Sequence, residues 1–280
     1  MTSDATRLRS REWLDTPELY GWLRRAAFRS QGFGEEAYEG QPIIGICNSW
    51  SELTHCNMHL RQLAEAVKRG VWQAGGFPLE FPVMSLGEYN MRPTTMLYRN
   101  LMSMEVEESI TANPLDGVVL LAGCDKTTPA MLMGAVSADV PAIVVTGGPQ
   151  LAGNWRGEEL GTCTDCRRYH QELRAGRITE EQWAELQSSI LRSPGHCMVM
   201  GTASSMAAMG EVLGMALPCN AAIPVVDSRR TQLAEEAGRQ IVETVNLDLR
   251  PSTILTREAF ENAIRTPSTP SAAPPTPSSI

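Results

Sequence analysis

The segment Gly123-Cys124-Asp125-Lys126-Thr127-Thr128-Pro129-Ala130 joins two stretches of opposite structural preference. Before it, the run 117–121 is apolar and rich in β-branched residues, which predicts a buried strand. After it, residues 130–136 are helix-prone, with Thr127 or Thr128 as the expected N-cap and Pro129 in the first turn. A cysteine, an acid and a lysine therefore lie side by side at a strand-to-helix turn. Because α/β proteins bind ligands at the carboxyl ends of their strands, this turn is a candidate site.

The same strand–helix alternation continues around this turn and predicts an α/β fold, a mainly parallel sheet with flanking helices. The expected strands are 42–47, 78–84, 116–121 and 141–146, and the helices between them are about 58–73, 94–112 and the one after Lys126. The loops that follow these strands carry Cys56, Glu88, residues 124–126 and Gly147-Gly148. These loops should gather at one edge of the sheet, because parallel strands all end on the same side.

Further helices are expected outside this alternating core. Residues 11–30 predict one or two amphipathic helices, 179–192 a helix with a capping box, 202–215 a tightly packed buried helix, and 227–245 an amphipathic helix, while another helix begins at 256. The stretch 150–177 predicts a longer irregular connection.

The composition is that of an ordinary globular protein of 280 residues, with 42% hydrophobic and 20% charged residues. Its net charge of −8, from 24 basic against 32 acidic residues, argues against binding to nucleic acids or to membrane surfaces. The charged start is no secretory signal, and no apolar run approaches the ~18 residues that span a bilayer. These features predict a cytoplasmic protein.

The chain has seven cysteines, an odd number, and no secretory signal, which argues against a fold held together by disulfides. Metal or cluster binding, catalysis and simple burial remain as alternatives. Cys163 and Cys166 have the spacing of a zinc site or a redox pair, and His196 with Cys197 could complete a zinc site. Cys219 reads as a packing residue and Cys47 as a core residue, although Cys47, nine residues before Cys56, is the main competitor of Cys56 as a ligand. His59 reads as either a buried histidine or a substrate contact.

Four motifs together resemble the dihydroxy-acid and sugar-acid dehydratase family, which includes 6-phosphogluconate dehydratase. They are Cys124-Asp125-Lys126 with Pro129-Ala130, Cys47-Asn48-Ser49-Trp50 with Cys56-Asn57 and His59-Leu60, Ala74-Gly75-Gly76, and Gly195-His196-Cys197 with Met200-Gly201-Thr202-Ala203-Ser204-Ser205-Met206. The likeness runs from about residue 8 to residue 265. The stretches 77–82 and 85–88 look most like the sugar-acid branch, especially the L-arabinonate dehydratases.

The resemblance implies an iron–sulfur cluster, [2Fe-2S] or [4Fe-4S], held here by Cys56, Cys124 and Cys197. It also implies a Mg²⁺ ion whose ligands would be Glu88, Asp125 and a carbamylated Lys126, with Asp125 and Lys126 also as catalytic residues. Members of the family are typically homo-oligomers and run to roughly twice this length. Their second domain, a β-barrel, supplies a further carboxylate ligand and a serine proposed as the base.

The family-like sequence stops near residue 265, which predicts a domain at 1–265 and a tail at 266–280. The tail consists almost entirely of Pro, Ser, Thr and Ala and should be disordered. It interrupts the helix that begins at 256, so we expect a frameshifted or truncated gene product that lacks the β-barrel.

Removing water from a dihydroxy acid requires electrophilic help at two oxygens, and the implied metals can supply it. The resulting prediction is a hydro-lyase that converts a sugar acid, an aldonate such as L-arabinonate, to the 2-keto-3-deoxy acid. Three alternatives stay open: dihydroxy-acid dehydratase of branched-chain amino-acid synthesis, an inactive cluster-binding fragment, and a structural zinc protein using Cys163 and Cys166.

Overall fold

The structure, a computed structural model, describes residues 8–265, apart from the side chain of Cys163. The predicted disordered tail lies outside the described residues, and the division of the chain at residue 265 stays a prediction.

Four parallel strands form the central sheet, as the alternating pattern predicts. They are β1 (Ile43–Asn48), β2 (Phe77–Pro82), β3 (Gly117–Ala122) and β4 (Ala142–Thr146), in the spatial order β2-β1-β3-β4. The crossovers are α3 (Leu60–Gln73), η3 (Thr95–Tyr98) with α4 (Arg99–Thr111), and α5 (Thr127–Ala138). The strand order reverses at β1 and β3, so the turns after these two strands meet at the middle of the carboxyl edge.

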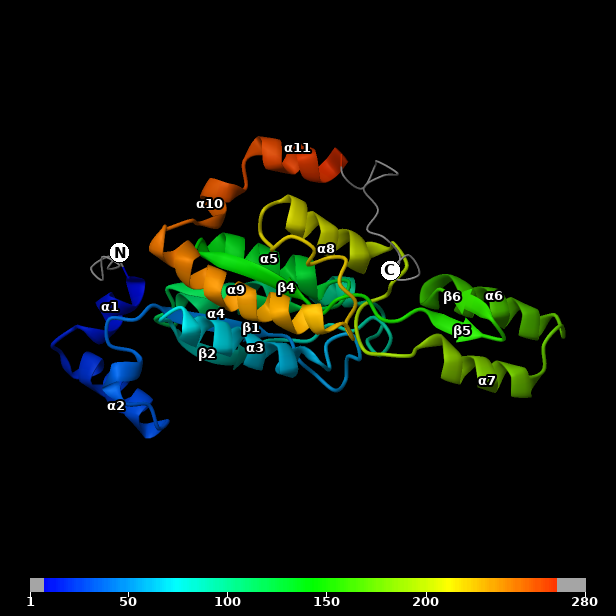
Figure 1. The fold of residues 1–280 in the computed structure, drawn as a ribbon, viewed down its shortest axis with the longest axis horizontal. Coiled ribbons are helices and arrows are strands. Elements are labelled where there is room, and N and C mark those ends of the chain that lie inside the picture. Colours follow the sequence, from blue (N-terminus) through cyan, green and yellow to red (C-terminus); the bar gives the residue numbers. More distant parts are fainter. Residues whose placement is uncertain (1–7, 266–280) are drawn as a thin grey trace.

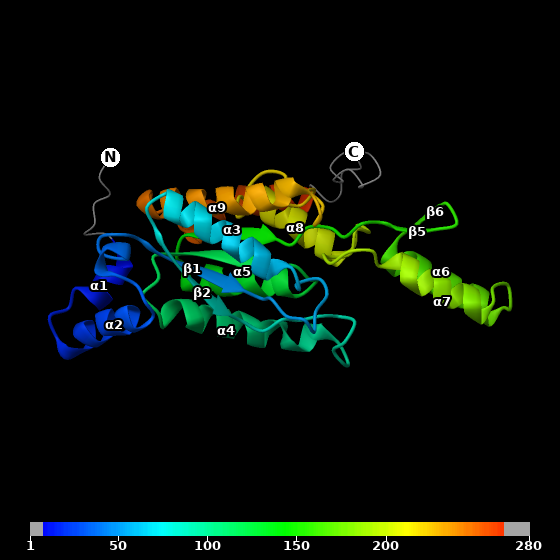
Figure 2. The same ribbon diagram turned by 60° about the horizontal axis from the view of Figure 1, so that its bottom comes forward.

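The two faces of the sheet are buried under different pairs of helices, because successive side chains of a strand point to opposite sides. Val118 and Leu120 pack with α4 and α5, whereas Val119 and Leu121 pack with α3 and α9 (Ser228–Asn246). Figure 2 shows α3 and α9 on one side of the sheet and α4 on the other. Burial on both faces explains why β3 reads as a continuous apolar run.

Strand β2 is an edge strand whose free side is blocked by proline. The amides of Phe77 and Val83 donate to carbonyls on the β1 side at 2.8 and 3.1 Å. Because amides alternate in direction along a strand, positions 78, 80 and 82 face the free side, and two of them, Pro78 and Pro82, have no N–H. Only Glu80 could donate to an added strand, so this edge is protected against sheet extension.

The opposite edge, β4, is covered by the segment that follows α8 (Thr202–Val212). Val144 donates its amide to the Met215 carbonyl at 2.7 Å and forms a parallel bridge with Ala216. Helix α8 itself is only half-buried, contrary to the prediction of a buried helix: Ala207 and Ala208 are buried, but Met206 and Met209 are partly exposed.

The stretch 150–177 is not irregular, as the sequence suggests, but forms most of an arm that projects from the body (Figure 1). The arm consists of β5 (Gly153–Trp155), antiparallel to β6 (Glu158–Leu160), followed by α6 (Thr162–Arg174) and α7 (Glu180–Ile190). Trp155, Leu160, Tyr169, Leu186 and Ile190 form its small core. The predicted capping box is confirmed, with the Thr179 and Gln182 side chains each bonded to the other residue's amide.

The helices expected within 11–30 and from 256 are confirmed as α1 (Arg9–Leu14), α2 (Leu19–Ser30) and α11 (Arg257–Arg265). Two short helices were not predicted, η2 (Glu35–Ala37) and α10 (Pro251–Ile254). Across residues 8–265, no helix combines the length and the apolar character needed to cross a membrane.

Candidate active site

Hydrogen bonds tie together the loops that leave β1, β2 and β3. The Asn57 side chain donates to the Ser49 carbonyl at 3.0 Å and to the Ser85 hydroxyl at 2.9 Å. The Ser49 hydroxyl in turn donates to the Leu121 carbonyl of β3 at 2.8 Å. Three loops that are distant in sequence are thereby held at one edge of the sheet, where the strand pattern predicts them.

Two glycines let the Cys56 loop approach the strand ends closely. A Cβ added at Gly123 would lie 2.8 Å from the Cys56 carbonyl oxygen, and one at Gly147 would lie 2.7 Å from the His59 ring. Both distances are below any ordinary carbon contact, so only glycine fits. The cysteine of the first loop is therefore pressed against the turns after β3 and β4.

The turn after β3 is fixed by a hydroxyl, although not in the predicted way. The Thr127 Oγ1 accepts from the Cys124 amide at 2.9 Å and donates to the Cys124 carbonyl at 3.0 Å. Thr127 is the first residue of α5, and the N-cap is Lys126, without a side-chain capping bond, so the N-cap prediction is wrong. Because Thr127 closes the turn, the side chains of Cys124, Asp125 and Lys126 are not needed for it and can make other contacts.

Three thiols meet at this edge. Cys56 and Cys124 are buried and Cys197 is half-buried. A hydrogen bond between the sulfurs of Cys56 and Cys124 raises the pKa of Cys56, as do its burial and the charge of Cys197, and the same bond lowers the pKa of Cys124. The two sulfurs therefore titrate as one pair, with Cys56 held toward its thiol form by the hydrogen bond to Cys124.

Beside the thiols, a lysine lies between two carboxylates. Lys126 Nζ is 2.8 Å from Asp125 Oδ1 and 3.4 Å from Glu88 Oε1, and its side chain is only 10% exposed. The Thr95 hydroxyl donates to Glu88 Oε1 and holds that carboxylate in place. A positive charge thus already occupies the position between two half-buried acids.

The donor atoms of the thiol group and of the carboxylate group match the iron–sulfur cluster and the Mg²⁺ ion that the sequence suggests. The three thiols offer soft sulfur donors, the type that iron–sulfur clusters use. Glu88 and Asp125 offer hard oxygen donors, the type that Mg²⁺ uses, and the Lys126 ammonium stands between them as a cation would. In the described part of the chain, no three His, Cys, Asp or Glu side chains converge on a single metal ion; a cluster with several irons needs its sulfurs further apart.

Sequence reasoning passed over His55 and Tyr89, which flank both groups. The His55 Nε2 lies 3.6 Å from the Cys56 sulfur, and its ring packs edge-on against Tyr89 at 4.9 Å between centroids. Tyr89 directly follows Glu88, so the two rings link the thiol group to the carboxylate group. Their only signal in the sequence is adjacency to Cys56 and Glu88.

Two buried histidines and a buried arginine support the loop after β4. His59 Nε2 donates to the Gly147 carbonyl at 2.8 Å, which leaves its Nδ1 unprotonated, because a carbonyl can only accept. Burial lowers the pKa values of both His59 and His196 to about 4, so both rings are neutral. Arg230, 1% exposed, donates to the carbonyls of Thr146 and Asn220 at 3.0 and 2.8 Å.

The other cysteines lie elsewhere. Cys47 is buried in the core on the α4 and α5 side, as expected, and burial raises its pKa. Cys219 is exposed and not a packing residue, at a turn where its φ is 67°. Cys166 packs against the small core of the arm. Since the Cys163 side chain is not described, the zinc alternative stays an untested prediction.

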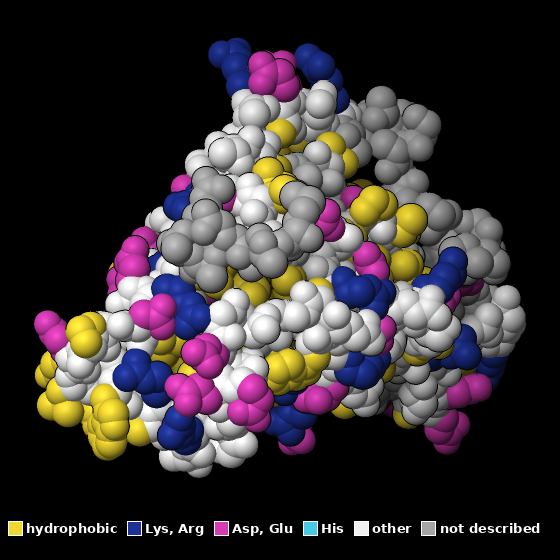
Figure 3. All heavy atoms as spheres, turned by 60° about the vertical axis from the view of Figure 1, so that its left-hand side comes forward, with side chains coloured by type: hydrophobic (Ala, Val, Ile, Leu, Met, Phe, Trp, Pro, Cys, Tyr) yellow, Lys and Arg dark blue, Asp and Glu magenta, His cyan; other side chains and the backbone are white. Residues whose placement is uncertain are grey.

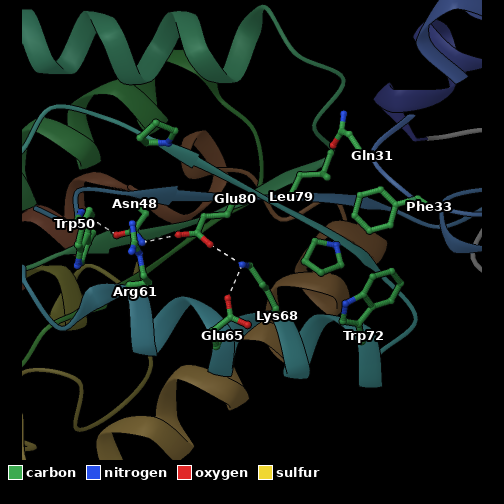
Figure 4. A pocket seen from close by; sticks show the side chains of 12 residues that line it. Gln31, Phe33, Asn48, Trp50, Arg61, Glu65, Lys68, Trp72, Leu79 and Glu80 are labelled. Carbon is green, nitrogen blue, oxygen red and sulfur yellow. Dashed lines mark hydrogen bonds and ion pairs between the residues drawn. The ribbon is translucent and has the colours of Figure 1, made fainter. Parts of the chain in front are cut away.

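A groove of about 720 Å³ runs along the free edge of β2 and one side of α3 (Figure 4). Lys68 crosses it, with Nζ 2.6 Å from both Glu65 and Glu80, and Asn48 donates to Glu80 at 2.8 Å. At the end near the Cys56 loop, the Arg61 guanidinium lies 3.6 Å from the Trp50 ring centroid. None of the twelve residues that line the groove belongs to the thiol or carboxylate groups.

Comparison with known proteins supplies the last observation. Residues 41–271 match the family described as "Dihydroxy-acid/6-phosphogluconate dehydratase N-terminal". The chain is 56% identical over 265 residues to an L-arabonate dehydratase of Azospirillum brasilense, covering 95% of this chain and 46% of the relative. It is 54% identical over 260 residues to an L-arabinonate dehydratase of Rhizobium leguminosarum bv. trifolii (93% and 45%), and 43% identical over 261 residues to a D-xylonate dehydratase of Caulobacter vibrioides (92% and 44%). The chain spans about half the length of these curated relatives.

Proposed function

The chain belongs to the dihydroxy-acid/6-phosphogluconate dehydratase family, and from this we propose that it serves as a hydro-lyase converting a sugar acid, such as L-arabinonate, to the 2-keto-3-deoxy acid. Its similarity to sugar-acid dehydratases supports the substrate class. The observation that carries the proposal is that three thiols lie together at the sheet edge where Lys126, two residues from Cys124, lies between two carboxylates.

In this proposal, Cys56, Cys124 and Cys197 hold an iron–sulfur cluster, and Glu88, Asp125 and Lys126 hold Mg²⁺. When bound, these groups supply Lewis acidity for the substrate oxygens that gain negative charge as water leaves. Burial of Cys56 and Cys124 keeps water away from two of the three sulfurs. Any proton on Cys56, Cys124 or Cys197 would leave when the cluster is loaded, since thiolates are the ligating form.

Lys126 has to lose its positive charge before its side chain can bind a metal ion. As an ammonium it neutralises Asp125 and Glu88, and it therefore competes with a metal ion for the same place. Loss of its proton, or conversion to a CO₂-derived carbamate, removes the competing charge; the carbamate also adds an oxygen donor. Asp125 would orient the Lys126 end group through their 2.8 Å contact, and the Thr95 hydroxyl would keep Glu88 turned toward it.

A dihydroxy-acid dehydratase of branched-chain synthesis is the second candidate, with the same chemistry on an apolar substrate. A dihydroxy-acid dehydratase of Halothermothrix orenii is 42% identical over 255 residues, which is less than the identity to the arabinonate enzymes. The candidate of another class is a protein that binds the cluster without turnover. Assays with L-arabinonate and with 2,3-dihydroxyisovalerate, beside a cofactor analysis, separate all three.

The first test is iron, zinc and acid-labile sulfide content, with a visible spectrum, on protein purified without oxygen. We expect iron and sulfide together, and their joint loss in Cys56→Ser, Cys124→Ser and Cys197→Ser. Cys219→Ser is the matched control, because this exposed cysteine should leave both unchanged. Zinc without sulfide, or iron retained in all three variants, would contradict the proposed ligands; cluster without turnover would favour the non-catalytic candidate.

A further inference from the structure

Gln150 lies in the loop after β4, where this loop meets the segment that carries Cys197. Its backbone amide donates to the His196 carbonyl at 2.9 Å, and the His196 amide donates to the Gly148 carbonyl at 3.0 Å. The whole residue is buried, with 0% of its surface exposed. Main-chain bonds therefore hold these two segments together, and the Gln150 side chain is not needed for that.

The nitrogen of the Gln150 side chain contacts two neighbours. Nε2 donates to the Thr162 hydroxyl and lies 3.9 Å from the Met198 sulfur, which also accepts from the Thr162 hydroxyl at 3.8 Å. Thr162 is the first residue of α6, at the base of the arm, and Met198 directly follows Cys197. An amide nitrogen carries two hydrogens, so these contacts use its full capacity to donate.

The oxygen of the same side chain contacts the Cys56 loop. Oε1 is buried, and among the residues that the structure describes it has no hydrogen-bond partner of good geometry. Burial lowers the pKa of the half-buried His55 ring, and contact with the Gln150 side chain raises that pKa, which is the effect of a hydrogen-bond acceptor. Because an amide nitrogen can only donate, the contact must join Oε1 to a ring N–H of His55.

Packing alone does not explain a glutamine at this position. A buried amide whose oxygen lacks a good partner destabilises a fold, whereas an apolar side chain of the same size does not. A methionine would fill the space beside Met198 without that cost. The amide oxygen is the part of the side chain that packing leaves unexplained.

His55 connects this oxygen to the thiols. Its Nε2 lies 3.6 Å and its Nδ1 lies 4.0 Å from the Cys56 sulfur, so the ring turns the edge with both nitrogens toward that sulfur. A neutral imidazole has one N–H and one unprotonated nitrogen. If the N–H bonds to Oε1, the unprotonated nitrogen is the one left to face the sulfur. Hydrogen bonds to ligating sulfurs help to set the reduction potential of an iron–sulfur cluster, so this choice has a chemical consequence.

We propose that Gln150 is a positioning residue, whose amide oxygen takes the ring N–H of His55 and leaves the unprotonated nitrogen toward the Cys56 sulfur. Its amide nitrogen fixes the side chain to Thr162 and Met198, so the orientation of the His55 ring depends on the base of the arm. The effect on a cluster rests on the proposed function, in which Cys56 is a ligand; the contact with His55 does not.

Nitrogen NMR of the four histidines, in protein without cofactors and at a pH where the rings are neutral, tests the contact. One tautomer of His55 should dominate in the parent, and Gln150→Met should change the tautomer ratio severalfold. His59 and His196 should not respond, because their rings bond to backbone carbonyls. Gln232→Met is the matched control, since Gln232 is an exposed glutamine of α9. An unchanged His55 ratio in Gln150→Met would overturn the proposal.

The reduction potential of the bound cluster tests the consequence. In Gln150→Met the freed N–H can reach the sulfur and stabilise the more negative, reduced cluster, so the reduced fraction at a fixed applied potential should rise severalfold. His55→Phe keeps a ring beside Tyr89 but removes both nitrogens. Adding Gln150→Met to His55→Phe should therefore change the potential no further. Equal shifts with and without His55 would overturn the proposal.

Urea unfolding separates positioning from packing. Gln150→Met should be at least as stable as the parent, because the oxygen that lacks a good partner is gone. A Gln150 that only fills space predicts the reverse pair of results, a less stable Gln150→Met protein with an unchanged His55 tautomer ratio. If no cluster binds at all, the proposed function fails, whereas the histidine spectra still decide whether Gln150 orients His55.

Discussion

At the scale of the residue, the absence of side chains matters as much as their presence. Gly123 and Gly147 allow the Cys56 loop to rest on the ends of β3 and β4, and His59 then bonds to the Gly147 carbonyl. A methyl group at Gly123 would press on the Asn57 side chain and the Cys56 carbonyl, and one at Gly147 would press on the His59 ring. The distance between Cys56 and Cys124 thus depends on residues that carry no reactive group.

Gly147→Ala should therefore displace the Cys56 loop and lower the iron bound per chain severalfold. The added Cβ would lie 2.7 Å from the His59 ring and 3.4 Å from the Cys56 carbonyl. Overpacking of this kind costs about 1–3 kcal/mol of folding free energy. Iron content and urea unfolding measure the two effects. Unchanged iron in a folded Gly147→Ala protein would show that the glycine does not set the position of the loop.

His59 should make the protein less stable toward acid. Its pKa in the folded state is lowered to about 4, chiefly by burial, against an ordinary value of 6.5. Between these values the unfolded chain binds a proton that the folded chain does not, so the free energy of unfolding falls as pH drops from 6.5 to 4. The contribution is at most about 3 kcal/mol, and it vanishes above pH 6.5.

His59→Gln isolates this effect, because the glutamine amide can still donate to the Gly147 carbonyl but does not titrate. Urea unfolding between pH 4 and 7 should show a shallower pH dependence in the variant than in the parent. Part of the dependence will remain, since His196 is shifted in the same direction. Parallel curves for the two proteins would mean that His59 is already accessible to protons in the folded state.

At the scale of the element, β2 shows how a sequence protects an edge strand. Its two prolines, Pro78 and Pro82, are four residues apart, so both lie on the side without a neighbouring strand. Lys68 and Glu80 place charge along the same edge, as Figure 4 shows. Proline inside a predicted strand usually argues against that strand. Here it shows which edge of the strand is free.

Pro82→Val should make the protein aggregate more readily through this edge. Position 82 is exposed, and valine restores an N–H that faces solvent. Pro82→Lys is the matched control: it restores the same N–H but adds a charge that opposes strand addition. Light scattering during incubation at 37 °C should rise faster for the valine variant only. Equal rates in both variants would point to unfolding, and not edge pairing, as the cause.

At the scale of the whole molecule, the fold depends on how closely α3 and α9 cross over the sheet. A Cβ at Gly238 of α9 would meet the Val67 carbonyl and lie 2.9 Å from the Val71 amide nitrogen. A Cβ at Gly70 of α3 would meet the Glu235 carbonyl in the same way. Two glycines facing each other's helix backbone let this layer lie flat against the sheet.

Gly238→Ala should consequently lower the free energy of unfolding by about 2–4 kcal/mol, because the two helices must separate. Gly210→Ala in α8 is the control, since no atom lies within 4 Å of the added Cβ there. Alanine in a helix is favoured over glycine by about 0.5–1 kcal/mol, so this variant should be slightly more stable. Urea unfolding curves of the two variants should shift in opposite directions; a stabilised Gly238→Ala protein would contradict the tight crossing.

The sequence by itself determined the sheet, its crossovers and the loops of its carboxyl edge. Long apolar runs separated by amphipathic helices leave few alternatives, and parallel strands necessarily bring their exit loops to one side. That is why Cys56, Glu88 and Cys124–Lys126 could be placed together before the structure was known. The arm was missed, because strands of three residues, Gly153–Trp155 and Glu158–Leu160, are too short to show a period.

Only the tertiary structure decided which residues touch. It set the Lys126 ammonium between Asp125 and Glu88 and the His55 ring against the Cys56 sulfur, and it gave the N-cap of α5 to Lys126 and not to a threonine. It also left Leu19, Trp22 and Leu23 of α2 exposed, where their spacing predicts a face packed on the domain, and it buried Phe28 of the same helix instead. Figure 3 shows hydrophobic side chains on the surface at this end of the molecule. Periodicity shows that a helix has two faces; the packing of the surrounding chain decides which one is buried.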